Sequence, residues 1–210
     1  MIDNNYELLR LETGLSEKVL KEIVYTLKSR SSNSYGRTDL TTMFVVGLDT
    51  EQLLLLGKAI AKVYLNSRKL VFHADMKDYS NELDSKILFR EREALYYYLP
   101  EEIKGLPDIL NEVKIKKQLV IIFENIDIGH FNNQHHLVKI IDNQQVSDMH
   151  GEIVDFSKSI IIFTPSKSKE DFVLQKVKTN WGFYQVDWSK LKLKSEFIGR
   201  INDRSIFSFK

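Results

Sequence analysis

The chain has 210 residues, of which 43% are hydrophobic and 28% charged, as expected for one soluble globular domain of ordinary size. Its net charge of +1 gives no reason to expect a dominant nucleic-acid or membrane-surface role, and the absence of cysteine excludes disulfides and thiolate chemistry. No apolar signal region follows Met1 and no apolar run approaches the length of a membrane span, so we expect a cytoplasmic protein.

The pattern of apolar residues predicts helices that alternate with buried strands. An amphipathic helix over 16–29 begins after the N-cap Ser16, and a polar loop follows at 29–38. A buried strand over 42–46 ends at Gly47 and leads into a helix over 50–65. The later expected elements are strands at 69–73, 119–123 and 159–163, helices at about 79–89, 106–116 and 132–142, a strand-like segment at 184–187 and a short helix at 194–202.

Strands that are apolar throughout and alternate with helices indicate a parallel sheet covered on both faces. We therefore expect an α/β fold, a three-layer α/β/α sandwich with a mainly parallel sheet, formed by one domain over residues 1–210. In such sheets the functional residues lie beyond the carboxyl ends of the strands. The expected ends are Gly47, His73, Glu124-Asn125 and Thr164-Pro165-Ser166.

The stretch LVIIFENID at residues 119–127 is a buried strand that ends in acidic residues. In P-loop ATPases such a strand delivers an Asp to the magnesium ion and, in many families, a Glu that polarises water. The corresponding pair here is Glu124 and Asn125. The Glu124 carboxylate is one methylene longer than Asp and retains the ability to bind magnesium, whereas the Asn125 amide cannot act as a base.

Several segments match one family in order and spacing. Residues 109–156, which include the acidic strand, follow the family pattern without a gap; DMKDY at 75–79 is similar to its DMSEY, and EFIGRIN at 196–202 is similar to its PEFLNRID. Over about residues 14–203 the chain resembles the large ATPase domain of the Clp-type AAA+ unfoldases, the ClpB and ClpA group. The resemblance implies a P-loop NTPase fold of the AAA+ type.

The phosphate loop of that family, GPTGVGKT, corresponds to GLDTEQLL at residues 47–54. Only Gly47 survives; Leu53 stands where the phosphate-binding Lys should be, and Leu54 where the magnesium-binding Thr should be. Asp49 and Glu51 add negative charge near the expected triphosphate, and each repels it by on the order of a kcal/mol or more. We interpret the segment as a capped strand-to-helix turn in which ordinary ATP binding is lost or severely weakened. The degenerate turn comprises Gly47, Asp49, Thr50, Leu53 and Leu54.

Other family positions are also altered. Thr164 and Ser166 follow the fourth strand, where the family has a polar sensor Asn. Arg200 matches the arginine finger that reaches a neighbour's γ-phosphate, although a salt bridge within the domain or at an interface explains it equally well. The family continues into a small helical lid, and we expect that lid to be absent.

The family's substrate-gripping pore loop, a pattern like GYVGY, corresponds here to a tyrosine run without the flanking glycines. Tyr96, Tyr97 and Tyr98 are candidates for a gripping or partner-binding surface, because Tyr is favoured at interfaces; packing of one or two of them on the core is the competing interpretation. The five histidines show no convergent ligand spacing, so we expect no metal site.

Together these features imply a catalytically inactive, Clp-like pseudo-ATPase that uses no cofactor and acts as a structural or regulatory protein-interaction module. Its partner would be an active AAA+ ATPase or a larger secretion or chaperone assembly. The alternative is a divergent chaperone or unfoldase subunit that still binds ATP and magnesium weakly, through the Gly47 backbone and Glu124. The balanced charge disfavours a nucleic-acid-binding module. The identity of the partner and the oligomeric state stay open.

Overall fold

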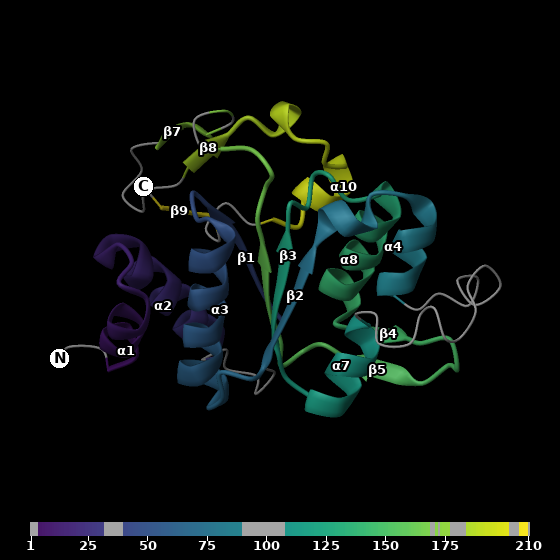
Figure 1. Ribbon diagram of the computed structural model, residues 1–210, viewed down its shortest axis with the longest axis horizontal. Coiled ribbons are helices and arrows are strands. Elements are labelled where there is room, and N and C mark those ends of the chain that lie inside the picture. Colours follow the sequence, from purple (N-terminus) through teal and green to yellow (C-terminus); the bar gives the residue numbers. More distant parts are fainter. Residues whose placement is uncertain are drawn as a thin grey trace.

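The computed structural model describes residues 4–31, 40–89, 108–168, 171, 173–176, 184–201 and 206–209. Its centre is a five-stranded sheet in which every neighbouring pair of strands is parallel, which confirms the expected α/β sandwich (Figure 1). The strand order across the sheet is β2 (Val71–Asp75), β3 (Val120–Glu124), β6 (Ile160–Phe163), β1 (Thr41–Val46) and β9 (Ile206–Ser208).

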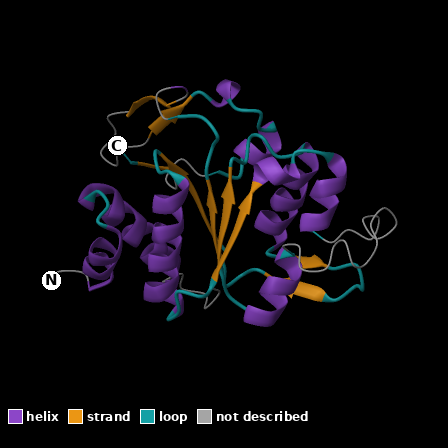
Figure 2. Cartoon of the chain, in the orientation of Figure 1, coloured by secondary structure: helices purple, strands orange, loops and turns teal. Residues whose placement is uncertain are grey.

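Helices cover both faces of this sheet (Figure 2). One face carries α1 (Asn4–Thr13), α2 (Glu17–Ser31) and α3 (Thr50–Leu65), and the other carries α4 (Glu82–Leu88), α7 (Ile109–Lys116) and α8 (Phe131–Asn143). The shorter elements are the 3-10 helices η1 (Met76–Tyr79) and η2 (Trp188–Lys190), the helix α10 (Ser195–Ile198), and two antiparallel hairpins, β4 (Gln145–Ser147) with β5 (Ile153–Asp155) and β7 (Val173–Lys176) with β8 (Tyr184–Val186).

The buried strands supply two separate cores because successive side chains point to opposite faces of a sheet. In β1, Phe44 and Val46 join the core under α7 and α8, whereas Met43 and Val45 join the core under α1, α2 and α3. The same alternation runs through β3 and β6. Strands that are apolar at every position are therefore explained by burial on both faces.

The element boundaries differ from the expected ones at the strand β2. His73 was expected to end this strand, but the strand continues to Asp75, which lies opposite Glu124 in the ladder with β3. The prediction was wrong because the apolar run stops at His73, whereas Ala74 is buried and Asp75 still pairs with β3. The helix α1 and the strands β4, β5, β7 and β9 were not predicted, whereas the strand-like segment expected at 184–187 is the strand β8.

Two carboxylates of the hairpin of β4 and β5, those of Asp148 and Glu152, join it to Lys114 of α7, and that of Asp148 is the less exposed. Asp148 accepts hydrogen bonds from the Lys114 ammonium and from the amide groups of Glu152 and His150, the latter two at 2.9 Å. The bond from Lys114, followed by those from the two backbone amides, lowers the pKa of Asp148 from 3.8 to about 2.

This lowered pKa predicts a pH-dependent contribution to stability. Because the folded-state pKa lies below the ordinary value, the contribution is fully present above about pH 3.8 and is lost as the pH falls toward about 2. We expect Asp148→Asn to remove this part of the acid sensitivity, measured as the urea midpoint of unfolding across that range. Asp155→Asn, at an exposed residue of the same hairpin, is the control. Parallel pH profiles for wild type and Asp148→Asn would contradict the assignment.

Candidate functional site

The carboxyl ends of β1, β2, β3 and β6 lie at the same edge of the sheet, at the top of Figure 1. The turn from β1 into α3 and the segments that follow β3 and β6 also meet there. Most of the site residues expected from the sequence lie on these segments. Their contacts decide whether the edge can hold a nucleotide.

The turn after β1 is short, and α3 begins at Thr50, three residues before the position of the missing phosphate-binding Lys. Asp49 is the N-cap of α3. Its Oδ1 accepts a hydrogen bond from the backbone amide of Gln52 at 2.8 Å, and its own backbone amide donates to the side-chain Oε1 of Gln52 at 3.2 Å. This capping box satisfies amide groups that a helix N-terminus would otherwise offer to a phosphate. The Asp49 carboxylate thus accepts from one of the amide groups at the start of α3 that could otherwise face an anion.

The two leucines that replace the phosphate-loop Lys and Thr point toward the protein interior. Leu53 is 1% exposed and belongs to the core under α1, α2 and α3, while Leu54 is half-buried against the same core. The first turn of α3 therefore contributes packing at the positions where the family has polar ligands.

Glu124 lies at the end of β3, and both of its carboxylate oxygens have partners within the chain. The Thr50 hydroxyl donates to Oε1 at 2.6 Å, and the Nε2 of His73, on the neighbouring strand β2, lies 2.8 Å from Oε2. Thr50 belongs to the degenerate phosphate turn, so this contact joins two of the expected motifs. The carboxylate that most resembles a magnesium ligand is held by protein groups on both sides.

Asn125 follows directly and is buried at 6% exposure. Its Nδ2 donates to the Asp75 Oδ1 at 2.8 Å, so it ties the end of β3 to the end of β2. Its backbone has a φ of 57°, in the left-handed region that Asn tolerates better than most residues. The residue at the catalytic-Glu position therefore has a structural role that suits an Asn.

A second carboxylate, that of Asp127, joins the loop after β3 to the loop after β6. It accepts hydrogen bonds from the Ser166 amide at 2.7 Å and from the Ser166 hydroxyl at 2.6 Å. Thr164 is buried, and its backbone amide and carbonyl bond to Phe123 and Ile126. The two sensor-like residues are thus both used to hold these loops in place.

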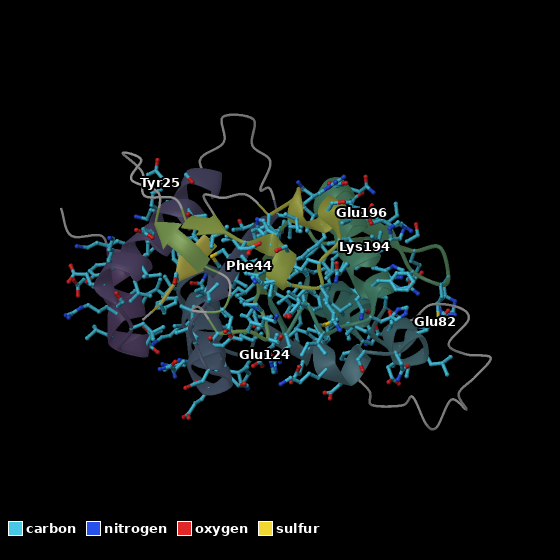
Figure 3. All side chains as sticks on the ribbon, turned by 90° about the horizontal axis from the view of Figure 1, so that it is seen from above. Tyr25, Phe44, Glu82, Glu124, Lys194 and Glu196 are labelled. Atoms are coloured by element: carbon cyan, nitrogen blue, oxygen red, sulfur yellow. The ribbon has the colours of Figure 1, made fainter. Side chains whose placement is uncertain are left out.

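Arg200, the residue that resembles an arginine finger, is paired within the domain. Its Nη2 lies 2.8 Å from the Asp142 Oδ2, its Nε lies 3.1 Å from Oδ1, and its Nη1 donates to the Glu196 carbonyl at 3.0 Å. The hydrogen bonds from Arg200 lower the pKa of Asp142. Figure 3 shows Glu196 well apart from Glu124, so Arg200 does not join the cluster at the strand ends.

Tyr96, Tyr97 and Tyr98 lie outside the described residues. Within the described ranges, no group of three or more His, Asp and Glu side chains is arranged to hold a metal ion. In the same part of the chain, no helix combines the length and apolarity needed to cross a membrane.

Asp75 and Asp127 of the cluster were not proposed as site residues from the sequence, and His73 was named only as the expected end of its strand. All three are polar and lie at or just beyond the carboxyl end of a buried strand, which is the signal that could have selected them. What the sequence does not contain is the order of strands. His73 and Asp75 reach Glu124 and Asn125 only because β2 lies next to β3.

Comparisons with known proteins agree with this architecture. Residues 33–204 match the family described as AAA domain (Cdc48 subfamily). The chain is 24% identical over 160 residues to the chaperone protein ClpB of Mycoplasma genitalium, covering 73% of this chain and 20% of that protein. It is 24% identical over 212 residues to ClpB of Prochlorococcus marinus, covering 96% and 24%, and 22% identical to heat shock protein 100 of Trypanosoma brucei brucei, covering 99% and 24%.

Among solved structures, the S. cerevisiae Hsp104-ADP complex has the same fold, with a TM-score of 0.71 and 17% sequence identity over 100% of this chain and 37% of that chain. The chain spans about a fifth to a quarter of the length of the curated relatives given above. The family match covers most of the sequence, and the parallel sheet agrees with it. The chain therefore belongs to the AAA domain (Cdc48 subfamily) family, as a domain of the Clp type.

Proposed function

We propose that this domain is a pseudo-ATPase that acts as a structural or regulatory protein-interaction module, as one AAA+-like large domain over residues 1–210. The observation that supports the proposal is the capping box of Asp49, whose carboxylate accepts a hydrogen bond from the backbone amide of Gln52 at the start of α3. Leu53 in the core and the fully bonded carboxylate of Glu124 support it. Its partner would be an active AAA+ ATPase or a larger secretion or chaperone assembly.

The physical argument compares what a nucleotide would gain and lose at this edge. A phosphate would have to displace the Asp49 carboxylate from the helix N-terminus, against the added charge of Glu51 and without a compensating lysine. A magnesium ion would have to compete with Thr50 and His73 for Glu124. Each step removes a satisfied contact, so the usual mode of ATP binding is disfavoured.

The retained carboxylate of Glu124 favours a second candidate, a divergent chaperone or unfoldase subunit that still binds ATP. Isothermal titration calorimetry with ATP and magnesium separates the two. We expect no saturable heat for the wild type and none for Asp49→Asn, which keeps a capping side chain but removes its charge.

A micromolar nucleotide affinity in the wild type would overturn the pseudo-ATPase. In that case, ATP turnover that collapses in Glu124→Ala would establish the enzyme, whereas binding without turnover would leave a nucleotide-regulated module. Far-ultraviolet circular dichroism of each variant checks that the fold is retained.

A further inference from the structure

A strip of three exposed lysines runs from Lys190, the last residue of η2, to Lys194, directly before α10. Lys190, Lys192 and Lys194 are exposed, whereas Leu191 is 5% exposed and Leu193 packs against the core. The backbone is extended at Leu191, with φ −109° and ψ 143°, and at Lys194, with φ −72° and ψ 143°. Alternate side chains of an extended segment lie on one side, roughly 7 Å apart, so Lys192 and Lys194 leave the backbone on the same side, and the exposed Lys190 precedes them at the end of η2.

This lysine strip is held rigidly by a buried side chain. Gln134 on α8 is 2% exposed; its Nε2 donates to the Lys192 carbonyl at 2.9 Å, and its Oε1 accepts from the Lys194 amide at 2.8 Å. Both hydrogen bonds go to the backbone, so they leave the ammonium groups free to face outward. An extended segment fixed in this way does not lose backbone entropy when a partner binds.

Within the described part of the chain, none of the three lysines of the strip lies within ion-pair distance of a carboxylate, whereas Lys21, Lys62 and Lys114 are paired. The nearest opposite charge is that of Asp187, whose pKa is lowered mainly by its hydrogen bond from Ser189 and to a smaller extent by Lys190. Since the whole chain has a net charge of only +1, this strip of lysines is a local feature and does not reflect a generally basic surface. Such a strip attracts a complementary run of carboxylates.

An aromatic ring lies beside one end of the strip. Phe131 is 52% exposed, and the Lys194 Nζ lies 4.5 Å from the centre of its ring. This contact positions the ammonium group without neutralising it. The exposed ring also offers an apolar contact for a partner. A side chain of the partner next to the carboxylate that meets Lys194 would reach it.

We infer that the lysine strip binds an extended, acidic segment of a partner protein, with carboxylates on alternate residues. A polypeptide fits better than a nucleic acid because carboxylates lie near both ends of the strip: Asp187 precedes it, and Glu196, 3.7 Å from His135, follows it. These two carboxylates repel a nucleic acid that extends beyond the strip, whereas a short acidic segment of a polypeptide can bind between them. Figure 3 shows Lys194 well apart from Glu124, so the inference does not depend on whether the strand ends bind nucleotide.

The test measures fluorescence anisotropy of a labelled peptide in which Glu alternates with Thr, at low ionic strength. A peptide of the same composition with its Glu residues contiguous is the comparison probe. We expect the variant Lys190→Gln, Lys192→Gln, Lys194→Gln to bind the alternating peptide roughly tenfold more weakly than wild type. The matched control, Lys18→Gln, Lys58→Gln, Lys69→Gln, removes the same charge from exposed positions on α2, on α3 and ahead of β2, and should keep wild-type affinity.

Wild-type affinity in the strip variant would overturn the inference, as would equal losses in both variants, which would indicate attraction by net charge alone. Equal affinity for the two peptides would overturn the alternating register. A single-stranded oligothymidylate that binds more tightly than the peptide, and loses affinity in the strip variant, would assign the strip to nucleic acid instead. Weaker binding of the alternating peptide by Phe131→Ala, with unchanged thermal unfolding, would support the strip and its aromatic neighbour.

Discussion

Leu53→Lys is expected to destabilise the domain by about 4 kcal/mol and to leave nucleotide binding absent, although it restores the family residue at the phosphate-loop position. Leu53 is 1% exposed in the core under α1, α2 and α3. A lysine there either leaves an unpaired ammonium group in an apolar environment or forces the first turn of α3 to unwind. The measurement is equilibrium unfolding in urea, paired with calorimetry in the presence of ATP and magnesium.

The control for this substitution is Leu55→Lys, two residues further along the same helix. Leu55 is 38% exposed, so the same chemical change should alter the free energy of unfolding by only about 0.5 kcal/mol. If Leu53→Lys were as stable as this control and gained nucleotide affinity, the turn would be able to rearrange into a phosphate loop. That result would contradict both the packing argument and the proposed loss of ATP binding.

Gly47→Ala is expected to cost about 3 kcal/mol, because two unfavourable effects coincide at this residue. Its φ of +86° is a conformation that residues with a Cβ rarely adopt, and an added Cβ would lie 2.5 Å from the backbone carbonyl oxygen of Phe209. The Phe209 amide in turn donates to the Val46 carbonyl at 2.9 Å, so the chain after β9 cannot easily move away. Chemical denaturation would measure the loss.

Gly151→Ala separates the two contributions. Gly151 has a similar φ of +81°, but nothing lies within 4 Å of an added Cβ, so this variant should lose only about 1 kcal/mol. Equal losses for the two variants would show that the contact with Phe209 is unimportant. The expected difference matters for the proposed function. A larger loss for Gly47→Ala would account for a glycine at this position by the close approach of Phe209, with no need for a bound phosphate.

The cluster at the strand ends shows which parts of the site could be read from the sequence. Glu124, Asn125, Thr50 and Asp49 were all selected as positions where a nucleotide site should be, and the structure places them at one edge of the sheet. The contacts that these residues make could be predicted from the sequence only in part. Asp49 was expected to repel a phosphate, and its N-cap bond to the Gln52 amide adds a local reason for its presence.

Arg200 illustrates the limit of a family resemblance. The sequence offered two equal interpretations, a finger toward a neighbour's phosphate and a salt bridge. The structure places its guanidinium against Asp142, a residue 58 positions away on α8. This pair depends on how α10 packs against α8, and no spacing rule within either segment contains that information.

The alternation of helices with doubly buried strands, and with it the α/β class, can be read from the amino-acid sequence, because apolar periodicity is a local property of each segment. Leu53 and Leu54, on which the proposed loss of the phosphate-loop ligands rests, are likewise read directly from the sequence. Only the tertiary structure decided which strands are neighbours, and therefore that His73 and Thr50 hold Glu124 and that Asp75 holds Asn125. Those contacts join residues 50 to 74 positions apart, and they form only when the sheet assembles around its two cores.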